Sequence, residues 1–422
     1  MTEGMPVSEV RILSSVDEVG PAAWEELTKA ADVDSSHGFL RFREYVEPGR
    51  SVLFTLGPPE RPRGALRGVV AVPGSGLTSD PWKFVGSQAV LRLDAGTDEA
   101  EAASLRRAQR DLVRAAADPA GRAGDDGGEP LWQALTRGLG ACLVVREFDR
   151  SELLCHPEAD AAEARSVAAR LVRAAQTSAA EHGAGAVAFP FVSPRDTLLR
   201  SVLTEAGFRG GAMTGASWVE TGGYGSYEEF LAVLPSRRRR RYRLEEQRLL
   251  EAPDLTTAEV DPVRNAARIA ELEARTLVKH GGLADAEAIR RARIELADRL
   301  PDDAVVIPAV IRDGRIIACA LHLRGPRSVV FMTYGCDYDV EERGPAYPWA
   351  AFYHPIRTAI AHGASSVRLG LEGFEAKTRR GAVVEARELW VWTPDAAALA
   401  RLGDLLELVG ERNTSYLGRF SQ

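Results

Sequence analysis

The sequence predicts an α/β protein made of two related halves. Short apolar runs typical of buried strands alternate with longer amphipathic stretches typical of helices along most of the 422 residues. Between two of these runs, an Asp313-Gly314 pair predicts a β-hairpin, because both residues tolerate the positive φ angles of a tight turn. A His-Gly-Ala motif also occurs twice, at 182–184 and 362–364, each time between a predicted helix and a predicted strand. We therefore expect two copies of one unit.

The first half, residues 1–225, is assigned to an N-terminal domain. Residues 9–60 are predicted to form strand, helix, helix and strand, followed by strands at 68–72 and 89–93. Residues 95–130 are rich in Ala, Arg, Asp and Gly, and are interpreted as an inserted helix followed by a flexible loop. A regular order of strand, helix, strand, helix and strand then follows. These elements are expected at 141–146, 161–181, 186–190, 197–206 and 212–220.

A helical, basic linker is predicted at 226–300, with five consecutive arginines at 237–241. The remainder, 301–422, is assigned to a C-terminal domain that repeats the theme. Its strands are expected at 304–311, 315–323, 328–334, 367–371 and 388–392, and its helices at 349–361 and 395–408. The resulting fold class is α/β, with two mixed-sheet domains and an intervening helical segment.

The repeated motif has a physical basis. A glycine after a helix can adopt the left-handed conformation that caps the C-terminus, so Gly183 and Gly363 are expected to end two helices. A histidine in the last turn also suits the helix dipole. Chance similarity of two helix-stop signals is the alternative. The matching order of the surrounding elements favours a duplication.

Composition limits the classes of function. The chain has 53 Lys and Arg against 60 Asp and Glu, a net charge of −7, so DNA binding is not expected and any RNA contact would need a local basic patch. It has no run of 18 apolar residues, and its polar start lacks the features of a signal peptide, so a cytoplasmic protein without a transmembrane segment is expected. Its four cysteines lack a CxxC spacing, and neither a zinc site nor any other metal site is expected.

Several segments carry a resemblance to a known family. They read VRILSSVDEVGPAAWEELTKAA, HGFLRFREYVEPG, ASWVETGGYGSYEEFLAVLPSRRRRRYRLEEQRL and AYPWAAFYHPIRTAIAHGASSVRLGLEGFEAKTRRG. Together they resemble the FemAB-like branch of the N-acetyltransferase-like (GNAT) superfamily, whose members have two tandem GNAT-type domains. The insert at 95–130 departs from the family pattern.

This resemblance implies the transfer of an acyl or aminoacyl group to an amine acceptor, with aminoacyl-tRNA or acyl-coenzyme A as co-substrate and no bound cofactor. One alternative is a coenzyme A-dependent N-acetyltransferase. Another is a non-catalytic ligand-binding protein of the same fold. The fold does not decide between these three functions.

Lys377 and Arg380 are candidate site residues in the expected loop 373–381. Cations in a loop after a buried strand can hold a carboxylate or phosphate, and Lys377 could stabilise the oxyanion of acyl transfer. A solvated basic turn is the alternative. Glu372, directly after the strand, is a candidate base, with an ordinary strand-end carboxylate as the alternative.

Two further groups are candidates. Arg240 and Arg241 share a helix face that could bind phosphates, although a salt-bridged, solvated helix explains the same arginines. Tyr347, Tyr353 and His354 lie near the start of a predicted helix, where they could act as acid or base or bind the acceptor. An aromatic packing stripe is the alternative for these three. Trp218 is a candidate for substrate binding that could equally be a core residue.

The stretch 341–346 stands where coenzyme A-dependent GNAT enzymes carry a Gln/Arg-x-x-Gly-x-Gly/Ala loop that cradles a pyrophosphate. Gly344 and Ala346 fit this pattern, but Glu341 replaces Gln or Arg and Pro345 removes a backbone donor. Carboxylates beside a pyrophosphate are repulsive. We therefore expect weak coenzyme A binding.

Overall fold

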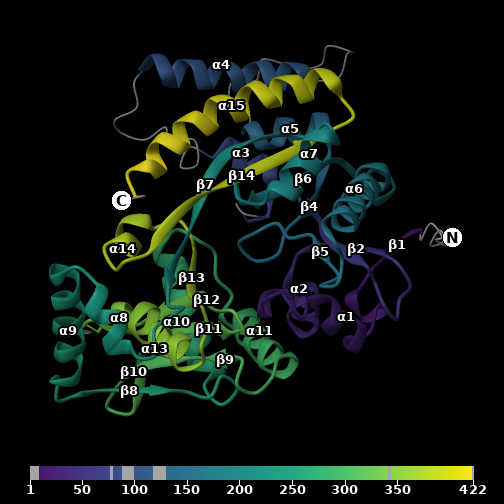
Figure 1. The fold of residues 1–422 in the computed structure, drawn as a ribbon. Helices are drawn as coiled ribbons and strands as arrows, with labels where there is room; N and C mark the ends of the chain where they lie inside the picture. Colours follow the sequence, from purple (N-terminus) through teal and green to yellow (C-terminus); the bar gives the residue numbers. More distant parts are fainter. Residues whose placement is uncertain (1–8, 77–78, 88–98, 117–129, 341–343, 421–422) are drawn as a thin grey trace. The chain divides into compact units, whose positions relative to one another are not determined.

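The computed structural model describes residues 9–76, 79–87, 99–116, 130–340 and 344–420. The chain divides into two compact units, each assembled from separate parts of the sequence (Figure 1). Unit 1 consists of Met1–Ala30, Glu47–Ala216 and Glu385–Gln422, and unit 2 consists of Ala31–Val46 and Ser217–Val384.

Unit 1 is built on a sheet with the strand order β1, β2, β3, β4, β6, β14, β7, in which β5 also pairs with β3. Its strands are β1 (Val10–Leu13), β2 (Gly49–Leu56), β3 (Gly64–Ala71), β4 (Ala141–Val145), β5 (Leu154–Cys155), β6 (Ala184–Val192), β7 (Arg209–Glu220) and β14 (Val383–Trp392). The strands from β1 to β4 are antiparallel neighbours, whereas β4 and β6 run parallel with Ala141 opposite Ala184. Both parallel strands are continuous apolar runs, as expected for strands buried on both faces.

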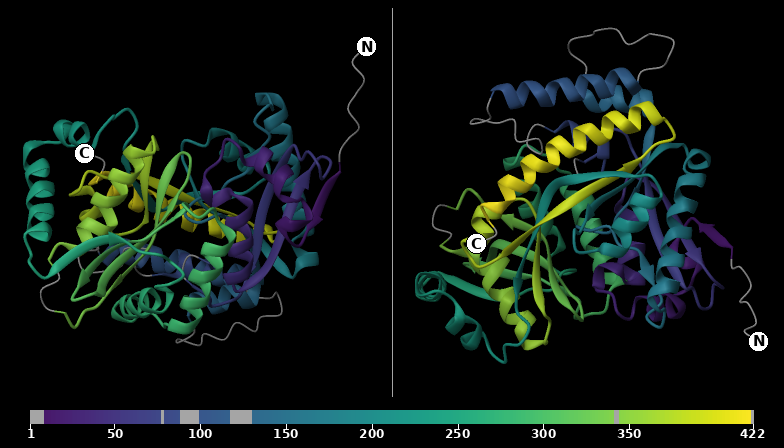
Figure 2. Two further views of the ribbon diagram at one scale, coloured as in Figure 1. Left: turned by 90° about the horizontal axis from the view of Figure 1, so that it is seen from below. Right: turned by 45° about the horizontal axis from the view of Figure 1, so that its top comes forward.

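Helices cover this sheet. They are η1 (Val16–Glu18), α1 (Pro21–Thr28), α3 (Pro81–Gly86), α4 (Glu99–Ala116), α5 (Leu131–Leu139), α6 (Ala161–Ser178), η3 (Ala180–His182), α7 (Thr197–Glu205) and α15 (Ala396–Gly418). Asp160 caps the start of α6 and Asp196 that of α7, each by accepting a backbone N–H of the first turn. The long helices α4 and α15 pack side by side (Figures 1 and 2).

Unit 2 has a second run of paired strands in the order β7, β13, β12, β11, β10, β8, with β9 beside β11. The added strands are β8 (Leu255–Glu259), β9 (Val305–Val306), β10 (Pro308–Arg312), β11 (Arg315–Arg324), β12 (Ser328–Cys336) and β13 (Ser366–Leu371). The predicted hairpin joins β10 and β11, and both Asp313 and Gly314 have positive φ angles. Strands β12 and β13 run parallel.

The helices of unit 2 are η2 (Val33–Ser35), α2 (His37–Val46), α8 (Tyr227–Val233), α9 (Ser236–Leu250), α10 (Ala266–Lys279), α11 (Ala286–Arg299), α12 (Ala346–Pro348), α13 (His354–Ala361) and α14 (Phe374–Thr378). A π-helical turn, η4 (Trp349–Tyr353), precedes α13. It stands directly before His354 and Pro355, and a proline in this place removes a backbone hydrogen bond of the helix.

The two predicted copies have the same order of elements. Unit 1 runs β4, α6, β6, α7, β7, and the later half of the chain runs β12, α13, β13, α14, β14. In each copy the first two strands are parallel and joined by a helix. Gly183 follows the turn η3 that continues α6, and Gly363 follows the end of α13. Their φ angles of 76° and 69° confirm the left-handed caps predicted from the repeated motif.

The last strand of each copy is divided between the two units, β7 after Ala216 and β14 after Val384. Strand β14 follows unit 2 in the sequence, yet it pairs with β6 of unit 1, where Glu388 lies opposite Val192. Strand β7 follows β6, yet its end lies beside β13, where the Ser217 hydroxyl donates to the Gly370 carbonyl at 2.8 Å. The two units therefore differ from the predicted division at 225 and 300. Unit 1 includes the C-terminal stretch, and the predicted basic linker lies inside unit 2.

Parts of the predicted insert can be placed. Helix α4 is the helix expected within 95–130, whereas the loop predicted at its end falls mostly on 117–129, outside the described residues. The strand predicted at 89–93 also lies outside them. Cys142 and Cys319 are buried inside strands, as expected for small apolar side chains.

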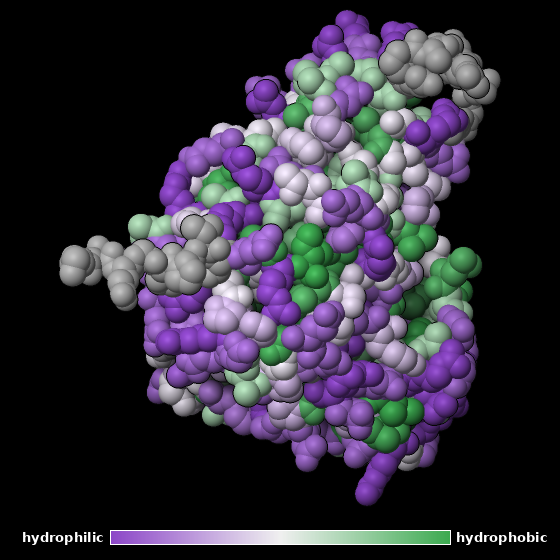
Figure 3. Space-filling view, turned by 90° about the vertical axis from the view of Figure 1, so that its right-hand side faces the viewer, coloured by the Kyte–Doolittle hydropathy of each residue, from purple (hydrophilic) through white to green (hydrophobic). Residues whose placement is uncertain are grey.

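Within the described ranges, no helix is long and apolar enough to cross a membrane. Hydrophilic side chains predominate on the face in Figure 3, and hydrophobic ones form separate patches there. The apolar side chains gather instead in cores under the sheets. In unit 1, Phe54 and Phe189 of the sheet pack against Leu171 of α6.

Candidate functional site

Strands β12 and β13 pair at their start and then separate. Ser328–Val330 lies opposite Ser366–Arg368, whereas the pairing of β12 with β11 continues to Cys336. Leu321 faces Thr333 and His322 faces Phe331, so Met332 is an extra residue that forms a β-bulge. A bulge bends the strand in which it occurs. In sheets with parallel strands, ligands bind near the carboxyl ends of those strands. This part of β12 is therefore the natural place for a site.

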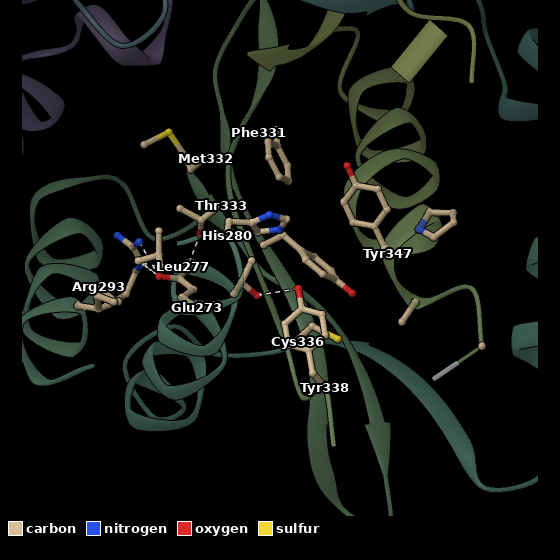
Figure 4. Close-up of a pocket in the computed structure, with 16 residues that line it drawn as sticks. Glu273, Leu277, His280, Arg293, Phe331, Met332, Thr333, Cys336, Tyr338 and Tyr347 are labelled. Carbon is tan, nitrogen blue, oxygen red and sulfur yellow. Dashed lines mark hydrogen bonds and ion pairs between the residues drawn. The ribbon is translucent and has the colours of Figure 1, made fainter. Parts of the chain in front are cut away.

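A cavity of about 710 Å³ lies along this part of β12 (Figure 4). All of its lining residues belong to unit 2. They come from α10 and His280 directly after it, from α11, from β12 and Tyr338 beyond it, and from the segment that begins at Gly344. The volume is that of a site for a sizeable small molecule.

The cavity has one strongly polar wall. Glu273 of α10 accepts hydrogen bonds from Arg293 of α11, with Nη2 at 2.7 Å and Nε at 3.0 Å from Oε2. The hydroxyl of Thr333 on β12 donates to Oε1 at 2.5 Å. The side chains of Glu273 and Arg293 are only 4% and 11% exposed. Three elements are thus joined by one buried, charge-balanced cluster (Figure 4).

Sequence reasoning missed this cluster. The signal was present on α10, where Glu273 falls four residues after Ile269 and therefore on the face that packs inward. A carboxylate on the apolar face of a helix needs a partner. Its partner, Arg293, lies on another helix, and helix periodicity does not identify such a partner.

Aromatic rings form the opposite wall. Tyr347, one of the predicted site residues, lines the cavity and meets Tyr334 edge to face, with ring centroids 4.9 Å apart. Phe352 packs edge to face against Tyr347, with ring centroids 5.6 Å apart. Burial raises the pKa of both tyrosines, so their phenols stay neutral hydrogen-bonding groups.

The predicted loop around Lys377 is a short helix, α14, and the lysine is buried. Its side chain donates from Nζ to the carbonyl oxygens of Gly370 at 3.2 Å and Leu371 at 2.9 Å, so the alternative of a solvated turn does not hold for this residue. Gly370, Glu372 and Gly373 all have positive φ angles, so the chain turns sharply here and its carbonyls point inward. Glu372 is exposed at this turn. The lysine thus holds the end of β13, and its predicted role in stabilising an oxyanion stays a prediction.

Tyr353 and Arg380 come together through a residue that the sequence analysis did not single out. The fully buried Tyr353 hydroxyl donates to Glu245 of α9, and Arg380 Nη2 lies 3.4 Å from the same carboxylate oxygen. Tyr242 packs on Tyr353 and donates to the Arg380 carbonyl at 2.6 Å. The Arg380 guanidinium lies over the ring of Phe352. These groups support the aromatic wall from outside the cavity.

His354 and Trp218 have other partners. His354 Nε2 lies 3.0 Å from Glu259 of β8, and burial lowers its pKa even though that carboxylate opposes the shift. The Trp218 indole donates to Glu220. Neither side chain is among those that line the cavity. In the part of the chain that the structure describes, no cluster of three His, Cys, Asp or Glu side chains could hold a metal ion.

Helix α9 presents the predicted basic face. Arg240 is exposed and Arg241 half-buried, and neither side chain has an ion pair or hydrogen bond among the described residues. The alternative, a salt-bridged and solvated helix, accounts for two neighbouring arginines, which have protein partners. Arg243 pairs with Glu228 at 3.0 Å, and Arg239 donates to the Ala232 carbonyl. Arg240 and Arg241 thus remain available for an anion.

The stretch compared with a coenzyme A loop borders the cavity. Gly344, with a φ angle of 55°, and Ala346 both line it. Glu341, whose carboxylate is expected to repel a pyrophosphate, lies outside the described residues.

Comparisons with known proteins agree with this architecture. The model of the FemAB-like family, described as peptidoglycan biosynthesis/recognition, matches residues 151–414. The crystal structure of FemX is 11% identical in sequence, with 84% of this chain and 90% of that chain covered at a TM-score of 0.52. A tandem GNAT protein from the clavulanic acid biosynthesis pathway is 12% identical, with 91% and 98% covered at a TM-score of 0.45. None of the curated proteins matches the sequence significantly. The likeness to FemX and the mixed sheets of the structure confirm the predicted α/β fold class.

Proposed function

The chain belongs to the FemAB-like family, and from this premise we propose that it transfers an acyl or aminoacyl group to an amine. The observation that carries the proposal is the 710 Å³ cavity beside β12, at the point where β12 and β13 separate. Because the family is described by peptidoglycan biosynthesis and recognition, the proposed acceptor is an amine on a peptidoglycan precursor.

The reaction needs positioning more than a covalent nucleophile. The amine nitrogen attacks the carbonyl carbon of the donor and forms a C–N bond. The C–O bond of an aminoacyl ester, or the C–S bond of a thioester, then breaks. The amine loses a proton, and the leaving oxygen or sulfur gains one. Holding the two reactants in line lowers the barrier substantially, and a hydrogen bond to the developing oxyanion adds to this effect.

The proposed roles follow from position. The neutral phenol of Tyr347 lines the cavity and can hydrogen-bond to a reacting oxygen. Lys377 acts as a positioning residue, since its ammonium fixes the turn at the end of β13. The roles predicted from the sequence stay predictions for four residues: acid, base or acceptor binding for Tyr353 and His354, base for Glu372, and substrate binding for Trp218.

The donor is proposed to carry phosphates. Arg240 and Arg241 are neighbours on α9, and their guanidinium groups have no partners among the described residues, which suits a polyanion such as tRNA. Arg380 is held by Glu245, so we propose a supporting role for it.

A binding and transfer assay tests the proposal. The purified protein is titrated with a panel of aminoacylated tRNAs, with the same tRNAs uncharged, and with acetyl-coenzyme A. Each donor, radiolabelled in its acyl group, is then incubated with an amine-bearing peptidoglycan precursor. We expect label in an amide product. If a folded protein transfers label from none of these donors to the amine, the proposed function is wrong.

A further inference from the structure

From the walls of the cavity we infer that its occupant is a bulky, uncharged, apolar group, such as an aromatic or branched aliphatic amino-acid side chain. The inference rests on the proposed function only in assigning that group to a substrate of acyl transfer. It adds a substrate class that the family match does not specify.

The charge balance of the cavity carries the first step. Among the described lining residues, the carboxylate of Glu273 and the guanidinium of Arg293 neutralise each other through two hydrogen bonds to Oε2, and Thr333 occupies Oε1. The only other ionisable nitrogen of that lining belongs to the exposed His280. A charged group entering the cavity would lose its hydration and meet no free opposite charge on the buried wall.

Shape and surface carry the second step. The remaining wall is mainly apolar or aromatic. Phe331, Met332 and Tyr347 line the cavity (Figure 4), and Tyr334 lines it in contact with Tyr347. A volume of about 710 Å³ is far more than a two-carbon acetyl group fills. The paired rings of Tyr334 and Tyr347 offer faces and edges for an aromatic guest, and Met332 can adapt to its shape.

Binding of capped amino acids tests the inference without any need for turnover. The probes are the N-acetyl amides of Phe, Leu, Ala, Lys and Glu, titrated by calorimetry against the full-length protein. We expect the Phe and Leu probes to bind at least about tenfold more tightly than the Ala probe, because they bury more apolar surface. The Lys and Glu probes should bind no better than Ala. Equal affinities, a preference for a charged probe, or no Phe binding at ~10 mM would each overturn the inference.

Variants locate the site. Phe331→Ala should weaken the Phe probe about tenfold and leave the Ala probe unchanged. Val233→Ala, at a 62% exposed position on α8, is the matched control and should change neither. Unchanged affinity of the Phe probe in Phe331→Ala would place that probe elsewhere and overturn the inference, as would an equal loss for both probes, which shows no preference for the larger group.

Charge variants test the neutral pair. Arg293→Met leaves the Glu273 carboxylate unbalanced, so the Lys probe should now outrank the Phe probe. The double variant Glu273→Gln/Arg293→Met restores neutrality and should restore the apolar preference. If the single variant melts before the assay temperature, the double variant alone decides, because a preference for Lys or Glu there would contradict the inference.

Two transfer arms identify which substrate carries the apolar group. One arm compares phenylalanyl-tRNA with alanyl-tRNA as donor, and the other compares phenylalaninamide with alaninamide as acceptor. Tight Phe-probe binding without any transfer supports the inference and argues against the proposed function. Transfer that favours small or charged groups in both arms keeps the function and overturns the inference.

Discussion

The ammonium of Lys377 donates a hydrogen bond to the carbonyl oxygen of Leu371 at 2.9 Å, which ties helix α14 to the end of strand β13. A second bond, to Gly370, joins the same nitrogen to the preceding residue. The turn between β13 and α14 has positive φ angles at Glu372 and Gly373. For Glu372, which has a side chain, this backbone conformation is strained, and it persists because neighbouring contacts stabilise it.

Lys377→Ala should therefore lower the free energy of unfolding. Hydrogen bonds of a charged donor contribute more than neutral ones, so we expect a loss of about 2–3 kcal/mol in equilibrium denaturation. Lys29→Ala is the control, since that side chain is 72% exposed and its loss should change stability by less than about 0.5 kcal/mol. If Lys377→Ala keeps full stability but loses turnover, the lysine stabilises the oxyanion directly, as the sequence suggested.

Reversing charge on α9 should weaken binding of a phosphate-rich donor. Arg240→Glu/Arg241→Glu is expected to reduce tRNA affinity and to flatten the dependence of log K on log salt by about 1.5 to 2 units, because two phosphate contacts are lost. The matched control is Arg106→Glu/Arg107→Glu, an adjacent exposed pair on α4. Equal losses in both double variants would show that only net charge matters.

Lowering the pH should reduce the free energy of unfolding because of the buried His322. Burial lowers the pKa of His322 to about 3, and its Nε2 contacts the Ala350 carbonyl at 2.8 Å. In the unfolded chain the pKa of this histidine is about 6.5. Below that pH the imidazole is protonated in the unfolded state but stays neutral in the folded state. Stability is then lost at up to about 1.4 kcal/mol per pH unit as the pH falls from about 6.5 towards 3.

The variant His322→Gln removes this titration. Its free energy of unfolding should fall less steeply than that of the parent between about pH 6 and pH 4, whatever its value at neutral pH. His280→Gln, at an exposed position, should retain the parent slope. Identical slopes in the parent and His322→Gln would rule out a neutral buried His322.

The two repeated caps should respond alike to substitution. An added Cβ meets no atom within 4 Å at Gly183 or Gly363, so alanine at either position pays only for its left-handed conformation, about 1 kcal/mol. At Gly185 the same change places a Cβ 1.9 Å from the Leu139 carbonyl oxygen and should cost far more. Thermal melts of the three variants check this order. A neutral Gly363→Ala would argue against the shared cap.

Much of the local structure was readable from the sequence. The strands of the two copies, the hairpin at Asp313-Gly314 and the caps at Gly183 and Gly363 were all predicted, because each depends on the residues of one short segment. Tyr347, a predicted site residue because of its place near the start of a predicted helix, lines the cavity.

Tertiary structure decided what depends on distant partners. The local pattern of β14 predicts a strand but cannot show that it pairs with β6, nearly two hundred residues earlier in the chain. Burial of Lys377 and the pairing of Glu273 with Arg293 also depend on elements that meet only after folding. Periodicity determines which residues face inward. Only the packed chain determines which of those buried charges neutralise each other, and so whether the cavity favours a charged or an apolar guest.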